Sequence, residues 1–379
     1  MKRVLFPGLL GLLLWACGGD ETTSPGGETE ITISVSPGRA IVDLNQQQLF
    51  RAYVFGTSQR DVIWYVEDIQ GGDDTFGTID SSGIYSAPSA EPDIDSIKVT
   101  AILQVDPAKY DDAWVFLSDP TKIYVDTSGS DTEGTGSKSN PYRTITHALT
   151  QWQEGQIIEV GLGTFDLEGG ETFPIQVGTG VVIKGVDKDS TFVVGPGGSH
   201  GEAGSVFSVT ADVVTISRLS ISTEDSNGIG IWFLPGFGTK IQSNHIGPNY
   251  AGIFASGANS PRPTIENNVI TGDSIGIVTS DDCEPIMRDN QITDCGLYGV
   301  QILDTSRPDM GVNDTTGVGG NTIQDCGPNN HWLVYNLSPD TIMAIGNSWV
   351  LPNPADNDQF IYDDEESGGS SGPVLLENQ

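Results

Sequence analysis

Basic residues are scarce in this sequence. Its 379 residues include 17 Lys and Arg against 51 Asp and Glu, which gives a formal net charge of −34. Proteins that bind nucleic acid need basic patches to neutralise phosphates, so this balance excludes nucleic acid as a partner. Only 18% of the residues are charged, however, so we expect a globular chain rather than a disordered polyacid.

A long apolar segment is also missing. A basic start, Lys2-Arg3, precedes the apolar stretch Leu5 to Trp15, which is too short to span a bilayer. The stretch ends in Leu14-Trp15-Ala16-Cys17 and resembles a bacterial lipoprotein signal. The resemblance implies cleavage before Cys17, a lipid on its thiol, and a location at the outer membrane or cell surface. We therefore predict a signal peptide at 1–16 and a flexible Gly-rich tether at 17–28.

Helical periodicity is absent from the second half, where two short phrases recur instead. An Asn-x-Ile phrase begins at Asn244, Asn268, Asn290 and Asn321. A Gly-Ile or Gly-Val phrase begins at Gly230, Gly252, Gly276 and Gly299. The Gly phrases recur after 22, 24 and 23 residues, a spacing that is typical of stacked repeats. Because β-branched runs and turn residues fill each repeat, the pattern predicts a parallel β-helix, in which each turn buries its apolar face against its neighbours.

Alignment of the repeats on the Asn indicates which residues stack. The Asn position itself continues to Asn347 and begins with Leu219. We interpret this column as a structural ladder, because Asn tolerates the bend at a coil corner and stacked amides can hydrogen-bond along the axis. Two residues before the Asn, Glu266 and Arg288 should be stacked neighbours that form an exposed ion pair.

Cysteines are few. Besides Cys17 the chain contains Cys283, Cys295 and Cys326, an odd number that leaves at least one unpaired. Cys295 and Cys326 stand in matching phrases and should stack in successive turns. Neighbouring strands are about 4.8 Å apart, whereas bridged Cα atoms usually lie about 5.5–6 Å apart. We therefore expect buried thiols in preference to a strained disulfide, and no Cys or His lies at a spacing suited to metal binding.

Residues 29–119 show short strands separated by turn clusters, as in a β-sandwich. The segment Ile63-Trp64-Tyr65-Val66, the run from Gly77 to Pro88 and Val99-Thr100-Ala101 resemble bacterial immunoglobulin-like modules. The resemblance implies a spacer or adhesion module with no chemistry of its own and with Trp64 in its core.

Residues 122–376 form the second expected domain. Thr144 is suited to cap a short helix that runs to Trp152. The segments from Ile123 to Ala148 and from Gly161 to Phe165 resemble the start of the DUF1565 family, in the pectate-lyase-like superfamily. The resemblance implies a right-handed parallel β-helix whose short helix closes the N-terminal opening of the coil. The expected fold class is thus all-β, with an immunoglobulin-like β-sandwich before this β-helix.

Four acidic residues are candidates for chemistry: Asp273, Asp281, Asp282 and Glu284. Paired carboxylates would suit a glycoside hydrolase, and Asp281, Asp282 and Glu284 could instead bind Ca²⁺. A solvated turn in an already acidic chain is the simpler interpretation. A calcium-dependent lyase would also need a basic side chain to remove a proton, and no arginine here stands in a catalytic phrase of the superfamily.

Aromatic residues suggest a different kind of site. After the Gly-Ile phrase, strand alternation turns Trp232 and Phe254 outward, followed in the same column by Val278 and Gln301. Such a stripe could stack on sugar rings, or it could pack against a loop or against the sandwich.

Three functions therefore remain open. The leading hypothesis is a lipid-anchored surface protein that binds a polysaccharide or cell-surface glycan without catalysis. The second is a polysaccharide lyase or glycoside hydrolase that uses the four acids, and the third is a structural spacer. An adhesion module predicts an open Trp232 and Phe254 stripe, an enzyme predicts converging acids, and a spacer predicts a stripe buried against the sandwich.

Overall fold

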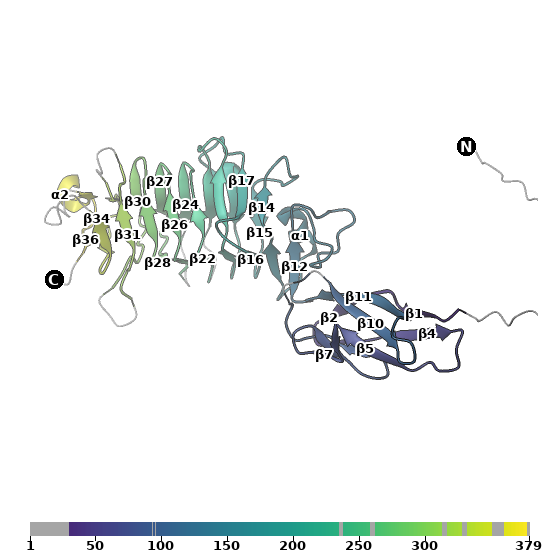
Figure 1. Ribbon diagram of the computed structural model, residues 1–379. Coiled ribbons are helices and arrows are strands. Elements are labelled where there is room, and N and C mark those ends of the chain that lie inside the picture. The colour runs from purple at the N-terminus through teal and green to yellow at the C-terminus, as the bar shows by residue number, and fades with distance from the viewer. Residues whose placement is uncertain are drawn as a thin grey trace, which may run out of the picture.

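The computed structural model describes residues 30–376, except 93, 95, 235–237, 258–261, 313–316, 328–331 and 351–359. The predicted signal peptide, Cys17 and the tether lie outside these residues. No helix in the described part is long and apolar enough to cross a membrane. The described chain is all-β, as predicted, and comprises a β-sandwich followed by a long coil of parallel strands (Figure 1).

The sandwich consists of short, mostly antiparallel strands. Its five-stranded sheet has the order β2 (Arg39–Asp43), β11 (Tyr110–Ser118), β10 (Ile97–Leu103), β5 (Val62–Val66) and β6 (Ile69–Gln70). The four-stranded sheet has the order β3 (Gln47–Leu49), β9 (Ile84–Ser86), β8 (Gly77–Ile79) and β7 (Gly72–Asp73), and β1 (Thr32–Ser36) pairs with β4 (Arg51–Phe55). Trp64 is buried in the core between them, as predicted.

The coil is built from three parallel sheets, and most turns contribute one strand to each sheet. The first sheet contains β12 (Lys122–Val125), β13 (Ile157–Val160), β16 (Val182–Gly185), β19 (Thr215–Ser217), β22 (Lys240–Gln242), β25 (Thr264–Glu266) and β28 (Ile286–Arg288). The second contains β14 (Gly163–Phe165), β17 (Thr191–Gly195), β20 (Ser220–Thr223), β23 (His245–Ile246), β26 (Val269–Thr271), β29 (Gln291–Thr293), β31 (Thr322–Gln324) and β34 (Ser348–Val350). The third contains β15 (Ile175–Val177), β18 (Ser205–Val209), β21 (Ile229–Phe233), β24 (Ala251–Ser256), β27 (Ile275–Ser280), β30 (Tyr298–Ile302), β32 (Val334–Asn336) and β35 (Ile361–Tyr362). A final pair, β33 (Ile342–Met343) and β36 (Val374–Leu375), closes the C-terminal end beside the short helix α2 (Asp364–Ser367).

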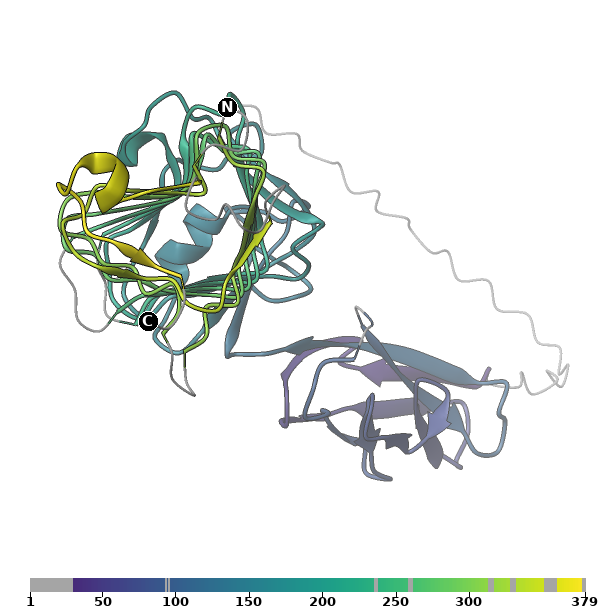
Figure 2. The same cartoon turned by 90° about the vertical axis from the view of Figure 1, so that its left-hand side faces the viewer.

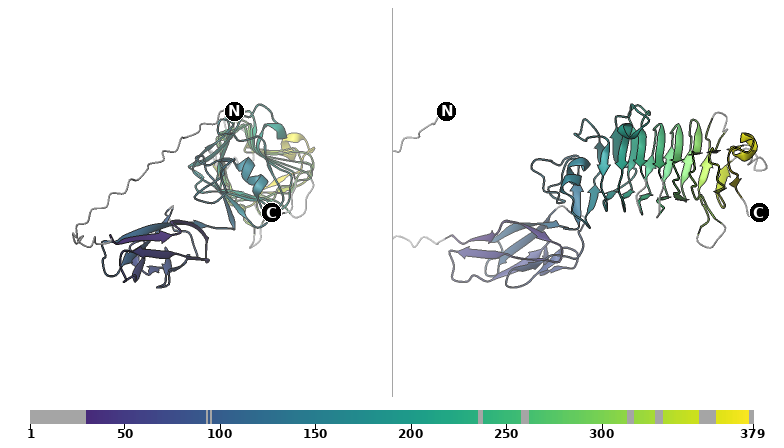
Figure 3. Two further views of the ribbon diagram at one scale, coloured as in Figure 1. Left: turned by 90° about the vertical axis from the view of Figure 1, so that its right-hand side faces the viewer. Right: turned by 180° about the vertical axis from the view of Figure 1, so that it is seen from behind.

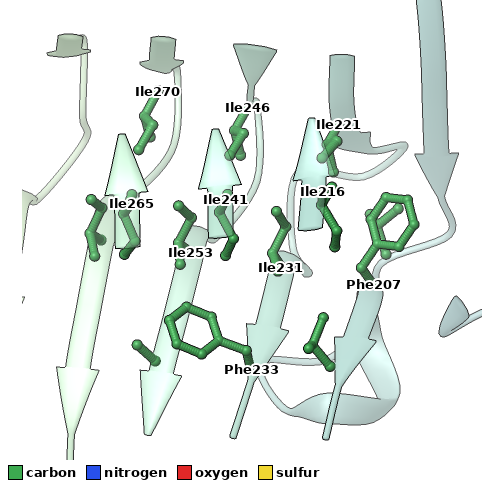
Figure 4. Packing of buried hydrophobic residues seen from close by; sticks show 14 of the residues in the cluster. Phe207, Ile216, Ile221, Ile231, Phe233, Ile241, Ile246, Ile253, Ile265 and Ile270 are labelled. Carbon is green, nitrogen blue, oxygen red and sulfur yellow. The ribbon is translucent and has the colours of Figure 1, made fainter. Parts of the chain in front are cut away.

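Stacked β-branched side chains fill the interior of the coil. Ile216, Ile241 and Ile265 occupy one register of the first sheet, and the second and third sheets contribute equivalent columns (Figure 4). These side chains are fully buried. Burying each one contributes about 1.5–3 kcal/mol, so the repeated Ile positions supply the main cohesion between turns.

The predicted asparagine ladder is present. The amide nitrogens of Asn244, Asn268, Asn290 and Asn321 each donate to the amide oxygen of the next Asn, at 2.8–3.1 Å. The same oxygens also accept the backbone N–H of the preceding Asn at 3.0–3.1 Å. All four side chains are buried, so the ladder satisfies the backbone at a corner where the chain leaves the sheets.

The repeated glycines are explained by close backbone approach. A Cβ on Gly230, Gly252 or Gly276 would lie 2.6–2.8 Å from the carbonyl oxygen of the glycine in the next turn. The same Cβ would also meet a buried Ile methyl group at 2.6–3.0 Å. Only glycine fits at these three positions, which accounts for the recurring Gly phrase in the sequence.

Cys295 and Cys326 lie in the same inner column as predicted, and both are buried free thiols. The neighbouring Cys326 thiol, followed by burial, raises the pKa of Cys295. A thiol of raised pKa is a poor nucleophile, so this pair is part of the packing.

A short helix closes the N-terminal opening of the coil, as predicted. Helix α1 (Ile145–Gln151) lies across that opening (Figure 2), and the Thr144 hydroxyl accepts the His147 N–H at 3.0 Å. The buried Glu171 carboxylate accepts the backbone N–H groups of Ile145 and Thr146. Asp131, from the preceding acidic turn, accepts the Thr144 N–H at 3.1 Å. Acidic residues here serve the helix N-terminus, where carboxylates are favourable.

The sandwich joins the first turn of the coil through a short connection between β11 and β12 (Figure 3). The Lys122 ammonium lies 3.9 and 3.8 Å from carboxylate oxygens of Glu91 and Asp119, and 3.4 Å from one of Glu159 in the coil. The Tyr124 hydroxyl donates to Glu91. One cation therefore bridges acids from both domains.

One predicted contact is wrong. Glu266 and Arg288 are paired neighbours in the first sheet, as expected from the register. Arg288 nevertheless forms its ion pair with Asp309, at 2.8 Å, and also donates to the Asp309 carbonyl oxygen at 2.7 Å. Two bonds to one residue hold the guanidinium more firmly than a flexible Glu266 could, because Arg presents several donors in a fixed plane.

Candidate functional site

The four acidic candidates have different environments, beginning with Asp273. Its side chain is buried at 2% exposure next to the buried Asn249. Neither carboxyl oxygen has a hydrogen-bond partner of good geometry among the described residues. Burial raises the pKa of Asp273 well above its usual range, which favours the neutral acid. A polysaccharide outside the coil cannot reach this group.

Asp281 and Asp282 lie in the turn after β27, both with left-handed backbone (φ 54° and 61°). The Asp281 carboxylate accepts the Ser256 hydroxyl at 2.7 Å, from the preceding turn of the coil. Asp304 accepts the Ser280 hydroxyl at 2.7 Å in the same way one turn later. The repetition indicates that this Ser–Asp contact holds successive turns together.

Glu284 belongs to a cluster of ion pairs on the outside of the coil. It pairs with Arg307, and its second oxygen lies 3.8 Å from Arg262. Arg262 also approaches Asp309 at 3.3 Å, and the same residues line a cavity of about 340 Å³. Glu284 is thus neutralised by two arginines instead of being available as a free acid.

The acids consequently do not converge. Within the described ranges, no three His, Cys, Asp or Glu side chains gather closely enough to hold a metal ion. The structure places Asp273 inside the coil, Asp281 and Asp282 in a turn, and Glu284 among arginines. It therefore gives no geometric support for a calcium site or a pair of catalytic carboxylates at these positions.

The outer face of the third sheet carries the aromatic stripe. Trp232, Phe254, Val278 and Gln301 are consecutive partners in the sheet, as predicted. The Trp232 and Phe254 rings stack with centroids 4.3 Å apart and planes 2° apart. Beneath them lies a second apolar cluster outside the coil, which includes the buried Ile229, Ala251, Ile275 and Val278. The stripe packs on its own sheet, and none of its described ring contacts involves the sandwich.

The stripe extends further than the sequence indicated. Tyr335 follows Gln301 in the sheet and Tyr362 follows Tyr335. Tyr298, Tyr335 and Tyr362 stack at centroid distances of 4.5 and 4.7 Å, with Trp332 at a steep angle to the last two. The long segment between β30 and β32 breaks the repeat spacing, so the sequence alone does not align Tyr335 with the column.

Stacking of the aromatic rings determines which of their atoms are accessible on this face. Rings that stack on one another cover each other's faces and expose their edges. All of these rings are half-buried, and burial together with the adjacent phenols raises the pKa of Tyr335. Neutral phenol groups both donate and accept hydrogen bonds. The face is therefore an uncharged strip of aromatic edges and hydroxyl groups in a strongly acidic protein.

These sheets, the capped coil and the outer aromatic strip define a parallel β-helix protein. Residues 127–355 match the family described as protein of unknown function (DUF1565), and the chain belongs to this family. No curated protein matches the chain. The family description assigns no activity, so function has to be argued from the residues.

Proposed function

We propose that the protein is an exported, lipid-anchored and non-catalytic module that binds saccharides on the outer face of the third sheet. The anchor rests on the lipoprotein-like sequence around Cys17 and the Gly-rich tether that follows it. Cleavage and acylation there would leave the folded domains outside the inner membrane, tethered at one end.

The observation that supports binding is the concentration of aromatic side chains on one outer face. Seven of them gather there: Trp232, Tyr250, Phe254, Tyr298, Trp332, Tyr335 and Tyr362. Half-exposed aromatic residues with polar tips are typical of interfaces, since they combine apolar area with hydrogen bonding.

A non-catalytic role is supported by the surroundings of three of the candidate acids, whose carboxyl groups are already bonded to other side chains or buried. Asp281 is bonded to Ser256, Glu284 is paired with arginines, and Asp273 is enclosed. A glycosidase needs two carboxyl groups that flank one bond at a defined separation.

A panel of neutral and acidic polysaccharides, with and without Ca²⁺, tests this proposal. Retention and release of reducing or unsaturated ends are both measured. Trp232→Ala should reduce retention about tenfold or more, as expected when a half-buried aromatic contact is removed. Phe192→Ala is the matched control, because Phe192 is a 39% exposed aromatic residue on the second sheet. Retention equal in both variants contradicts the outer-face site. Product release that disappears in Asp281→Ala/Asp282→Ala would make the protein an enzyme, and no retention would favour a spacer.

The anchor is tested separately. Cys17→Ser should move the protein from the detergent phase to the aqueous phase after export. Continued partition into detergent would contradict lipidation at this residue.

A further inference from the structure

The junction between the sandwich and the coil contains a cavity of about 440 Å³. Its walls come from five segments: Ile41 on β2, the end of the sandwich at Ser118 to Pro120, the first strand of the coil, the loop from Thr135 to Tyr142, and the end of the cap helix with the turn after it, from Gln151 to Gln156. Pockets for small ligands usually fall between 300 and 1,000 Å³ and often lie at domain interfaces. The volume and the position therefore both suit a ligand site.

Neutral hydrogen-bonding groups dominate the lining. Gln151, Gln153 and Gln156 come from the end of the cap helix and the turn after it, and Thr135 and Ser137 come from the loop before that helix. Amides and hydroxyls can both donate and accept, which suits a ligand that carries many hydroxyl groups. Tyr142 and Ile41 add apolar surface, and Ile41 is 59% exposed although it is a large aliphatic residue.

The single cation in the lining is already neutralised. Lys122 lies within 4 Å of carboxylates of Glu91, Asp119 and Glu159. Among the described residues, the lining contains no second Lys or Arg. An anionic ligand would consequently find no unpaired positive charge here, and the net charge of −34 would repel it. The ligand is thus expected to be uncharged.

The walls are held in place before any ligand arrives. The Gln156 amide donates to the Pro120 carbonyl at 3.0 Å, which links the helix side to the interdomain connection. Its amide oxygen accepts the Gln153 N–H at 2.9 Å, and its carbonyl accepts the Trp152 indole N–H at 2.7 Å. A preorganised site loses less entropy on binding.

We infer that this junction cavity is a second binding site, which takes an uncharged mono- or short oligosaccharide between the sandwich and the cap helix. This site is separate from the outer aromatic face, and its lining suits neutral sugars. Sugar hydroxyls would pair with Gln151, Gln153 and Ser137, and the apolar side of a ring would cover Ile41.

Isothermal titration calorimetry with neutral oligosaccharides of glucose, mannose and galactose tests the inference, with uronic-acid oligosaccharides as the charged arm. The double variant Gln151→Ala/Gln153→Ala should weaken binding of a neutral saccharide at least about tenfold, since two net hydrogen bonds are lost. Both side chains are exposed, so the fold should be retained. Ser137→Trp, which fills the cavity, should abolish binding at the junction and leave binding at the outer aromatic face unchanged. Gln291→Ala, an exposed glutamine on β29, is the matched control and should bind as the unmodified protein does.

The outcomes separate this site from the proposed outer face. Binding that is lost in the cavity variants but retained in Trp232→Ala supports the cavity and argues against the outer face. Binding that is lost only in Trp232→Ala overturns the cavity and leaves the proposed function standing. Preferential binding of uronic-acid oligosaccharides overturns the assignment to neutral sugars, and the absence of heat with every saccharide overturns the site.

Discussion

Replacement of Asn290 by Leu should interrupt the asparagine ladder at its centre. The Asn290 amide nitrogen donates to the Ile265 carbonyl at 2.8 Å and to Asn321 Oδ1 at 2.9 Å. Its oxygen accepts the backbone N–H of Asn268 at 3.1 Å and the side-chain amide of Asn268 at 3.0 Å. Leu219 holds the first position of the same column, so a Leu is compatible with this kind of site.

The expected cost follows from these four hydrogen bonds. A net contribution of about 1 kcal/mol each gives a loss of about 4 kcal/mol in the free energy of unfolding. The Asn268 backbone N–H also loses its acceptor while it remains buried, which raises the cost further. Domains of this kind are usually stable by about 5–15 kcal/mol, so the loss should be a large share of the total.

Guanidinium unfolding followed by tryptophan fluorescence measures the global effect, and hydrogen exchange at the Asn268 amide measures the local one. The matched control is Gln291→Ala, because Gln291 is the next residue but is exposed and should change stability by less than about 0.5 kcal/mol. A loss in Asn290→Leu no larger than in the control, with unchanged exchange at Asn268, would refute the structural role of the ladder.

Three further predictions concern charged and capping groups. The pKa of Asp273 is raised above 3.8 in the folded state. The folded protein therefore holds the proton of the Asp273 carboxyl group more tightly than the unfolded chain does. As a result, the free energy of unfolding falls as the pH rises above 3.8. Asp273→Asn should remove this loss, so the variant should gain in melting temperature over the unmodified protein more at pH 8 than at pH 4, and an equal difference at both would contradict the assignment. Lys122→Met should leave three carboxylates facing one another and lower the free energy of unfolding by about 1–2 kcal/mol, a modest loss because the groups are only partly buried. Small-angle scattering of this variant should show a broader range of interdomain distances. An unchanged scattering profile would mean that Lys122 does not hold the junction. Thr144→Ala should cost about 1 kcal/mol of stability through loss of the N-cap, measured by thermal unfolding, with the exposed Thr150→Ala expected to cost less.

Much of the coil could be predicted from the sequence, because every repeat contributes the same physical requirement at the same position. The Asn phrase predicts a column of stacked amides, and the Gly phrase marks a column with no space for a side chain. Alternation along a strand places Trp232 and Phe254 outside. These inferences need only the register, which the repeat spacing supplies.

The candidate site was harder to predict, because charge and burial are not related in a simple way. Asp is a residue type that usually lies on the surface, yet Asp273 lies inside the coil beside Asn249. The register did contain a signal: Asn249 and Asp273 each stand three residues before a repeated Gly, at Gly252 and Gly276. Two polar residues in one inner column indicate an internal polar strip instead of solvated surface residues.

Segments that depart from the repeat account for the remaining errors. Asp309 lies in the long connection after β30, so no spacing rule links it with Arg288. Tyr335 is displaced from the aromatic column by the following insertion in the same way. Long-range partners of this kind depend on how a connection folds back over the coil, which a local pattern does not specify.

Because the coil is a stack of equivalent turns, its length can change only by the addition or loss of whole turns. Each turn meets only its two neighbours, and the special structures lie at the ends, where α1 covers one opening and β33 with β36 closes the other. A duplicated turn, such as residues 268–289, would lengthen the coil by about 4.8 Å and leave both ends unaltered. Relatives with more or fewer repeats would then differ in the length of the coil while they keep the same cap and the same junction, so the gain or loss of one repeat changes the distance between the two ends by one step.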